Sequence, residues 1–355
     1  MSATPLVGPL DRVGAVWGGN AIDVVALEEY CKGAMPGYVG PLEIAQFHGG
    51  VSNPTFLLTD TGTTTRYVLR KKPSGDLLSS AHAVDREYRV MAALGDSDVP
   101  VPTMLAFCGD PGVIGTPFYL MQFLEGRIYT DNRLADMSRE QRREAYRAVA
   151  RSLATLHAVK AGTVGLGDYG QPGNYFERQI ARWSRQYRQG QTEDIASMER
   201  MMTALLSRIP ADYCVGIVHG DFRLENVMFA SDTPDVIAVL DWELSTVGAP
   251  LADLGFFCLF YHAEFMGWGS NATIDFATSG IPTEAEFVAD YCAASGRIGI
   301  EDFGFYLGFS AFRLAAIAQG VHRRTLVGTT RALHDGGNGA RNWADLAERL
   351  LLRPL

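Results

Sequence analysis

The first third of the chain alternates apolar and polar positions in the two-residue rhythm of half-buried β-strands. A helical pattern interrupts these segments over 81–94, where Val84, Tyr88 and Met91 fall on one face. The strand-like segments lie at 42–50, 53–62, 64–73, 102–108 and 116–124. Turn residues separate them, so the pattern predicts a mostly antiparallel sheet with one inserted helix, ending near Gly126.

The first 40 residues predict a lead-in to this sheet that contains a single helix. The segment 23–34 reads as helical, and Pro36 and Gly37 follow where the helix is expected to end. Beyond packing, the sequence assigns no role to this lead-in.

After the predicted sheet, the apolar positions recur with helical spacing. Ser138 and Gln141 form a capping-box signature at the start of a long helix over 139–159, and Thr283 and Glu286 form another before the helix expected at 284–295. Two β-prone stretches, 215–229 and 233–243, form a short strand island among the helices. Further helices are expected at 174–189, 193–208, 250–262, 284–295, 301–323 and 341–352.

A β-rich part followed by an α-rich part favours an α+β fold with two lobes over an alternating α/β fold. The length of 355 residues agrees with this, because single cores stop growing near ~250–300 residues. We therefore expect a lead-in over residues 1–40, a β-rich N-terminal lobe over 41–125 and an α-rich C-terminal lobe over 126–355.

Charge and composition narrow the class of protein. The net charge of −9 argues against a nucleic-acid or anionic-membrane partner, because both bind basic surfaces. The five cysteines are scattered without a Cys-x-x-Cys pair, which favours buried free thiols in a reducing compartment. No secretory leader opens the sequence, and no apolar stretch reaches the ~20 residues that span a bilayer. We expect a soluble cytoplasmic protein.

The segment 215–229 places polar residues in a short gap between β-prone stretches. Asp221 follows a tight turn at Gly220 and is suited to accept a proton from a hydroxyl. Asn226 offers a neutral oxygen to a hard cation such as Mg²⁺, and the return of the next strand can bring the carboxylate of Asp241 beside it. A polar turn would explain an isolated His-Gly-Asp, but a base beside a metal–phosphate site is what phosphoryl transfer needs.

These residues resemble a known pair of motifs. The segment "HGDFRLEN" followed by "LDWE" is similar to the signature of the aminoglycoside phosphotransferase and choline kinase-like families, which share the protein-kinase-like fold. The resemblance covers about 49–324. It implies that Asp221 is the catalytic base, that Asn226 and Asp241 are Mg²⁺ ligands, and that His219 orients the loop.

The resemblance also implies a nucleotide site in the N-terminal lobe. A glycine-rich turn containing Gly50, Ser52 and Asn53 would cover the phosphates, although such turns are common in ordinary hairpins. Glu87 matches the helix glutamate of the family. The segment "LMQFLEG" would form the hinge that meets adenine, with Gln122, Phe123 and Leu124 as its candidate contacts.

The phosphate-binding cation departs from the family pattern, which usually has a lysine. Arg70 stands at this position, and strand alternation places Lys72 on the same face, so Lys72 is the substitute if the register differs. Arginine can hold phosphate and Glu87 in a bidentate manner, but the two cations are not interchangeable as ligands.

The acceptor is less clear from the sequence. Arg313 and Arg323 could meet an anionic substrate tail, or they could be a solvated helix end. Trp268 lies in an aromatic stretch that is otherwise explained by helix packing, and Glu243 could reach the metal or have a local role. Several segments are most similar to kinase-like domains fused to acyl-CoA dehydrogenases, which implies a hydroxyacyl or hydroxyacyl-CoA acceptor.

The sequence therefore predicts a kinase that uses ATP and Mg²⁺ to phosphorylate a small-molecule hydroxyl. Phosphorylation of an aminoglycoside is the alternative within this class. A nucleotide-binding pseudokinase module is the alternative from another class, and a metal hydrolase is a third. The oligomeric state, and the choice between ATP and GTP, stay open.

Overall fold

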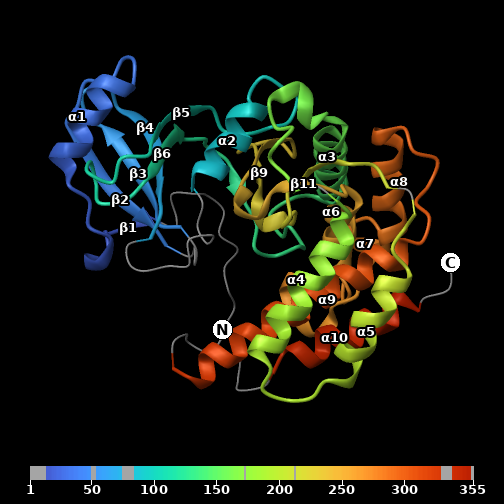
Figure 1. Cartoon of the computed structure of the whole chain (residues 1–355). Helices are drawn as coiled ribbons and strands as arrows, with labels where there is room; N and C mark the ends of the chain where they lie inside the picture. Colours follow the sequence, from blue (N-terminus) through green and yellow to red (C-terminus); the bar gives the residue numbers. More distant parts are fainter. Residues whose placement is uncertain are drawn as a thin grey trace. The chain divides into compact units, whose positions relative to one another are not determined.

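The computed structural model describes residues 13–48, 53–73, 84–171, 173–211, 213–328 and 338–352, without the side chains of residues 267 and 268. The chain folds into two compact units. Residues up to Thr130, together with Leu224–Ser245, form the first unit. The second unit contains Asp131–Arg223 and the residues from Thr246 onward. Figure 1 colours both units along the sequence.

A six-stranded antiparallel sheet forms the first unit, in the order β1-β2-β3-β4-β6-β5. The predicted strands are all present, and β1 is an addition that the sequence did not reveal. The strands are β1 (Val13–Gly14), β2 (Leu42–Phe47), β3 (Thr55–Asp60), β4 (Thr65–Lys71), β5 (Met104–Cys108) and β6 (Phe118–Gln122).

The register of this sheet sorts its side chains onto two faces. Arg70 of β4 lies opposite Thr55 of β3 and opposite Tyr119 of β6, so the three form one row. Because successive side chains point to opposite faces, the neighbouring row of Leu69 and Leu120 faces the other way, into a buried apolar core. The row of Arg70 faces the candidate site.

The helix α1 (Val24–Ala34) covers the apolar face of the sheet, as Figure 1 shows. Leu27 and Cys31 are fully buried in the core that this helix closes. Polar contacts fix it as well: the hydroxyl of Tyr30 donates to the carbonyl of Phe107 at 3.0 Å. The predicted lead-in is therefore a packed part of the first unit.

The boundary between the units differs from the predicted one. Leu224–Ser245 was assigned to the second lobe, but it belongs to the first unit. The cause is a three-stranded sheet in which β9 (Val227–Phe229) pairs with both β10 (Val236–Val239) and β7 (Arg127–Ile128). The partner of β9 lies about a hundred residues earlier in the chain, a pairing that a local sequence pattern cannot reveal. The helix α2 (Val84–Leu94) also belongs to this unit, and residues 81–83 of the predicted helix lie outside the described part.

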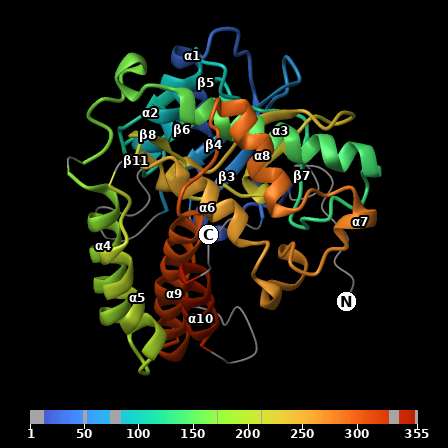
Figure 2. The ribbon, with the colours of Figure 1, turned by 90° about the vertical axis from the view of Figure 1, so that its right-hand side faces the viewer.

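Helices dominate the second unit, and both predicted capping boxes are present, at Ser138 and at Thr283. The long helices α9 and α10 lie side by side in both views (Figure 1 and Figure 2). The strand β8 (Gly216–Val218) pairs with β11 (Thr246–Gly248). The helices are α3 (Arg139–Ala158), α4 (Tyr175–Gly190), α5 (Ala196–Ser207), α6 (Leu251–Leu259), α7 (Phe276–Ser279), α8 (Glu284–Ser295), α9 (Phe303–Leu326) and α10 (Ala340–Leu351).

The most apolar stretch of the sequence forms the core of the second unit. Phe256 and Phe257 of α6 are buried, and Phe257 stacks on Phe287 of α8 at 4.3 Å between ring centroids. This confirms that the aromatic residues of α6 serve helix packing. In the described part of the chain, no helix is both long enough and apolar enough to cross a membrane.

The packing of α1 gives a stability prediction. Leu27→Ala should lower the free energy of unfolding by about 2–5 kcal/mol, because it removes buried methyl groups and leaves a cavity. Val25 lies on the same helix but is 78% exposed, so Val25→Ala should change the stability by less than about 0.5 kcal/mol. Denaturant unfolding of both variants measures the difference. Equal effects would show that α1 does not complete this core.

Candidate active site

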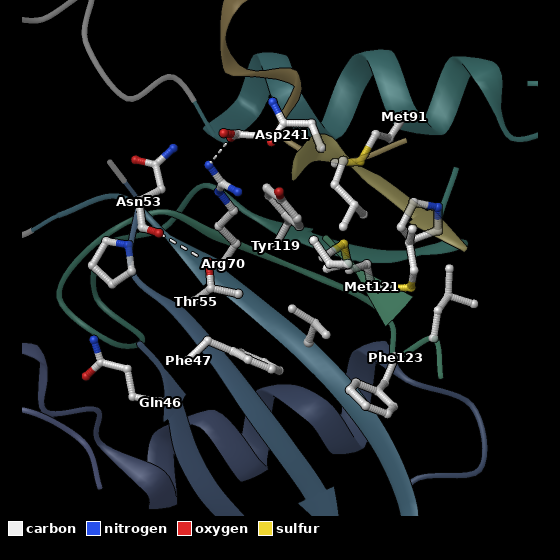
Figure 3. A pocket seen from close by; sticks show the side chains of 18 of the residues that line it. Gln46, Phe47, Asn53, Thr55, Arg70, Met91, Tyr119, Met121, Phe123 and Asp241 are labelled. Atoms are coloured by element: carbon white, nitrogen blue, oxygen red, sulfur yellow. Dashed lines mark hydrogen bonds and ion pairs between the residues drawn. The ribbon is translucent and has the colours of Figure 1, made fainter. Parts of the chain in front are cut away.

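A pocket of about 410 Å³ opens on the Arg70 face of the first unit's sheet. Val68, Arg70 and Tyr119 of β4 and β6 line it, and Gln122–Leu124 line it where β6 ends. Figure 3 shows Arg70 pointing toward Asp241, with Tyr119 beside it. A concave site with an apolar lining and a few convergent polar groups is typical of small-molecule binding.

The hairpin of β9 and β10 brings Asn226 and Asp241 to this same pocket. The backbone N–H of Leu240 donates to the carbonyl of Asn226 at 2.8 Å, so the ends of the two strands are fastened together. The return of the chain that the sequence predicted is therefore present. The backbone of Asp241 has a φ of 66°, the left-handed conformation, which costs a non-glycine residue about 1–3 kcal/mol and is common at functional sites.

Arg70 joins two carboxylates in the pocket. Its Nη2 atom lies 2.6 Å from Oδ1 of Asp241, and its Nε atom lies 3.1 Å from Oε2 of Glu87. Oε2 of Glu243 is 3.8 Å from Nη2. Burial alone would lower the pKa of Arg70, but Glu87 and Asp241 outweigh it and raise the pKa above its ordinary value. The guanidinium therefore stays protonated and positively charged.

The side chain of Glu87 on α2 is fully buried, and a buried carboxylate is costly unless it is paired and hydrogen-bonded. The hydroxyl of Tyr119 donates to its Oε2 at 3.0 Å, and the amide of Asn53 donates to its Oε1. Burial raises the pKa of Glu87, and Arg70 and the two hydrogen bonds oppose that rise. Glu87 is thus part of a buried network of polar contacts with Arg70, Tyr119 and Asn53, and it does not lie on a solvated helix face.

The predicted nucleotide residues are brought together in part. Asn53, Arg70 and the hinge segment 122–124 line one pocket with Asn226 and Asp241, and Glu87 touches it through Arg70. Lys72 is not among the described lining residues. It follows the end of β4, where its N–H donates to the carbonyl of Pro117. Among the described lining residues, Arg70 is the one lysine or arginine. Gly50 and Ser52 lie outside the described residues.

The loop that carries Asp221 belongs to the second unit. The buried carboxylate of Asp253 accepts the N–H of His219 at 2.6 Å and the N–H of Gly220 at 2.8 Å. The N–H of Asp221 in turn donates to Nδ1 of His219 at 3.2 Å. Gly220 has a φ of 85°, which glycine adopts without strain, so the turn before Asp221 depends on this residue. Asp253 therefore braces the loop.

His157 extends this brace and was missed by sequence reasoning. Its Nε2 atom lies 3.6 Å from Oδ2 of Asp253, and its Nδ1 atom is 2.8 Å from the hydroxyl of Tyr291. Burial lowers the pKa of His157, although Asp253 opposes the change. No local signal could have identified it, because His157, Asp253 and Tyr291 come from three different helices.

The candidate acceptor residues have different partners in the structure. Arg313 is buried, donates to the carbonyl of Gly220, and lies 4.8 Å from the ring centroid of Phe256, which makes it a second brace of the loop. Arg323 donates to the carbonyl of Gln189 at 2.8 Å. Glu243 belongs to the first unit, beside Arg70, and the side chain of Trp268 lies outside the described residues.

The donor set of the pocket suits a hard cation. Asn226 and Asp241 both offer oxygen, and Mg²⁺ is usually held by one or two carboxylates together with phosphates. Among the described residues, no group of three or more His, Cys, Asp or Glu side chains could hold a metal.

Comparison with known proteins identifies the family. Residues 43–305 match the model of the phosphotransferase enzyme family. The chain belongs to this family. Its fold is that of a Ralstonia eutropha JMP134 protein of known structure, provisionally assigned as an aminoglycoside phosphotransferase, with a TM-score of 0.85, 42% identity and coverage of 93% of this chain and 98% of that one. The two-lobed kinase-like fold that the sequence predicted is thereby confirmed.

The curated relatives are longer proteins. The mouse acyl-CoA dehydrogenase family member 10 is 42% identical over 92% of this chain, and the match covers 31% of the mouse protein. The human acyl-CoA dehydrogenase family member 11 is 40% identical over 87% of this chain and 40% of its own length. The chain thus spans less than half the length of either relative.

The buried network gives a testable coupling between Arg70 and Glu87. Arg70→Met leaves the fully buried Glu87 without its cation, and Glu87→Met takes one of two close carboxylates from the largely buried Arg70, so each should lower the stability by about 3 kcal/mol. The double variant should lose less than the sum of the two, with a coupling above about 1 kcal/mol in a thermodynamic cycle.

The matched control is the pair of Arg66 and Glu125 in the same unit, which is largely exposed. Its cycle should give about 0–1 kcal/mol, because water screens exposed charges. Denaturant unfolding of all variants supplies both values. A coupling for Arg70 and Glu87 no larger than that of the control would contradict a buried, mutually dependent pair.

Proposed function

We propose that this phosphotransferase transfers the γ-phosphate of ATP to the hydroxyl of a small molecule in a Mg²⁺-dependent reaction. The observation that carries the proposal is the pocket in which Arg70 is held between Glu87 and Asp241, with the hinge segment 122–124 in the same lining. A cation, a helix carboxylate and a metal-binding carboxylate are the parts that phosphoryl transfer by this fold requires.

Each residue has a role in this proposal. Arg70 binds the α- and β-phosphates, and Glu87 keeps its guanidinium in place. Asn226 and Asp241 are the residues that would hold Mg²⁺, which when bound neutralises phosphate charge. The oxygen of the acceptor hydroxyl attacks the γ-phosphorus, and Asp221 accepts the proton of that hydroxyl. The bond between the γ-phosphorus and the oxygen that leaves with ADP breaks. His219, Asp253 and Arg313 fix the backbone that carries Asp221.

For the acceptor we propose a hydroxyacyl compound, as the free acid or its CoA thioester. The support is the resemblance to relatives named acyl-CoA dehydrogenase family members, in which this part occupies a minority of the chain. The provisional assignment of the Ralstonia protein favours an aminoglycoside instead, and that acceptor is the second candidate. We propose a cytoplasmic location for the enzyme, on the composition of the chain.

The first experiment measures phosphate transfer from labelled ATP to a panel of hydroxyacyl compounds, with and without CoA, and to a panel of aminoglycosides. Transfer to the acyl panel alone supports the proposal in full. Transfer only to aminoglycosides keeps the mechanism and replaces the acceptor. ATP binding without transfer to either panel would favour a pseudokinase.

The catalytic base gives a specific expectation for this assay. Asp221→Asn should lower kcat by about 10²–10⁴-fold, because it removes the proton acceptor while keeping the size of the side chain. The increase in melting temperature caused by ATP and Mg²⁺ should remain, since the nucleotide residues are untouched. Asp232→Asn, at an exposed turn, is the matched control and should leave kcat unchanged. Full activity of the Asp221→Asn variant would exclude this residue as the base.

The metal residues give a second expectation. Asn226→Ala should raise the Mg²⁺ concentration needed for half-maximal activity by about tenfold, since one oxygen ligand is lost. A titration of initial rate against Mg²⁺ at saturating ATP measures this. An unchanged Mg²⁺ requirement would mean that Asn226 does not bind the metal.

A further inference from the structure

The segment that precedes the family match takes part in the pocket. The family model begins at residue 43, yet Trp17 and Asn20 line the same pocket as Arg70 and Asp241. They lie there because β1 adds a strand to the edge of the sheet, with Val13 opposite Phe47 of β2. The sequence pattern predicts no role for this segment beyond packing, so its presence at the pocket requires an explanation.

Trp17 is held in place although it is exposed. The residue is 65% accessible to solvent, whereas tryptophan is on average highly buried. Its backbone N–H donates to Oε1 of the buried Gln46 at 3.0 Å, and its ring stacks on that of His48, with 5.7 Å between centroids and 30° between planes. Both partners also line the pocket.

Gly14 of β1 makes this arrangement possible. A Cβ atom at Gly14 would lie 2.5 Å from Nε2 of His48, closer than such atoms approach. Any larger residue would therefore push the imidazole away from its position under Trp17. The strand pairing, the glycine and the stacked rings together hold a fixed aromatic surface at the edge of the pocket.

The chemistry of this surface suits a nucleoside. Aromatic faces stack on a purine or cover a ribose at little entropic cost, and base–aromatic stacking contributes about 1–3 kcal/mol. The amide of Asn20 adds hydrogen-bonding capacity beside the rings. We propose that Trp17, supported by His48, is a wall of the nucleotide pocket that contacts the nucleoside of bound ATP. This inference rests on the proposed function.

The test measures ATP affinity in the full chain. Trp17→Ala should weaken the Kd for ATP by about tenfold, which corresponds to ~1.4 kcal/mol. Trp17→Phe should restore most of the affinity, because it keeps an aromatic face. Phe265→Ala, another exposed aromatic residue but outside this pocket, should leave the Kd unchanged. The melting temperature without nucleotide should be the same for Trp17→Ala and the native chain, which separates a contact with ATP from a loss of folding.

Tryptophan fluorescence supplies an independent readout. ATP should quench the native protein, and this quenching should be largely lost in Trp17→Phe. If the native chain binds ATP and Trp17→Ala binds it equally well, the inference is wrong while the proposed kinase function stands. If the native chain does not bind ATP at all, the proposed function and the inference both fall.

Discussion

The site in the first unit depends on one largely buried cation, Arg70, held between two carboxylates. Arg70 on the sheet, Glu87 on α2 and Asp241 at the end of β10 come from three separate elements, and the charge of Arg70 ties them together. Because an unpaired buried charge is costly, each of the three residues restricts where the other two can lie. The pocket and the position of the β9–β10 hairpin both follow from this constraint.

In the second unit, buried charged groups hold the backbone turn that precedes Asp221. Asp253 accepts two consecutive N–H groups from His219 and Gly220, and Arg313 donates to the carbonyl of Gly220. The main chain just before Asp221 is thus bound from both sides by buried charged groups. A base that must receive a proton at one point in space gains from such rigidity, since small errors of position greatly reduce transfer.

Sequence patterns predicted what is local and missed what is not. The strands β2 to β6, the helices and both capping boxes follow from periodicity and from residues three apart, and Arg70 and Glu87 from a motif placed on those elements. The assignment of β9 to the first unit, the brace at His157 and the approach of Trp17 to the pocket depend on partners far along the chain. No spacing in the sequence encodes such partners.

The arginine at position 70 allows one side chain to contact two carboxylates, those of Glu87 and Asp241. A guanidinium presents donors in a planar fork, so it can meet Glu87 through Nε and Asp241 through Nη2 at the same time. The ammonium group of a lysine is a single point charge, so it would have to approach both carboxylates with one nitrogen atom. The departure from the family's usual lysine is thus matched by its surroundings, because Tyr119 and Asn53 also fasten Glu87 in the orientation that the fork requires. Every charged group of this network therefore has a partner of the opposite charge, and this supports our proposal of a working phosphotransferase over that of a pseudokinase.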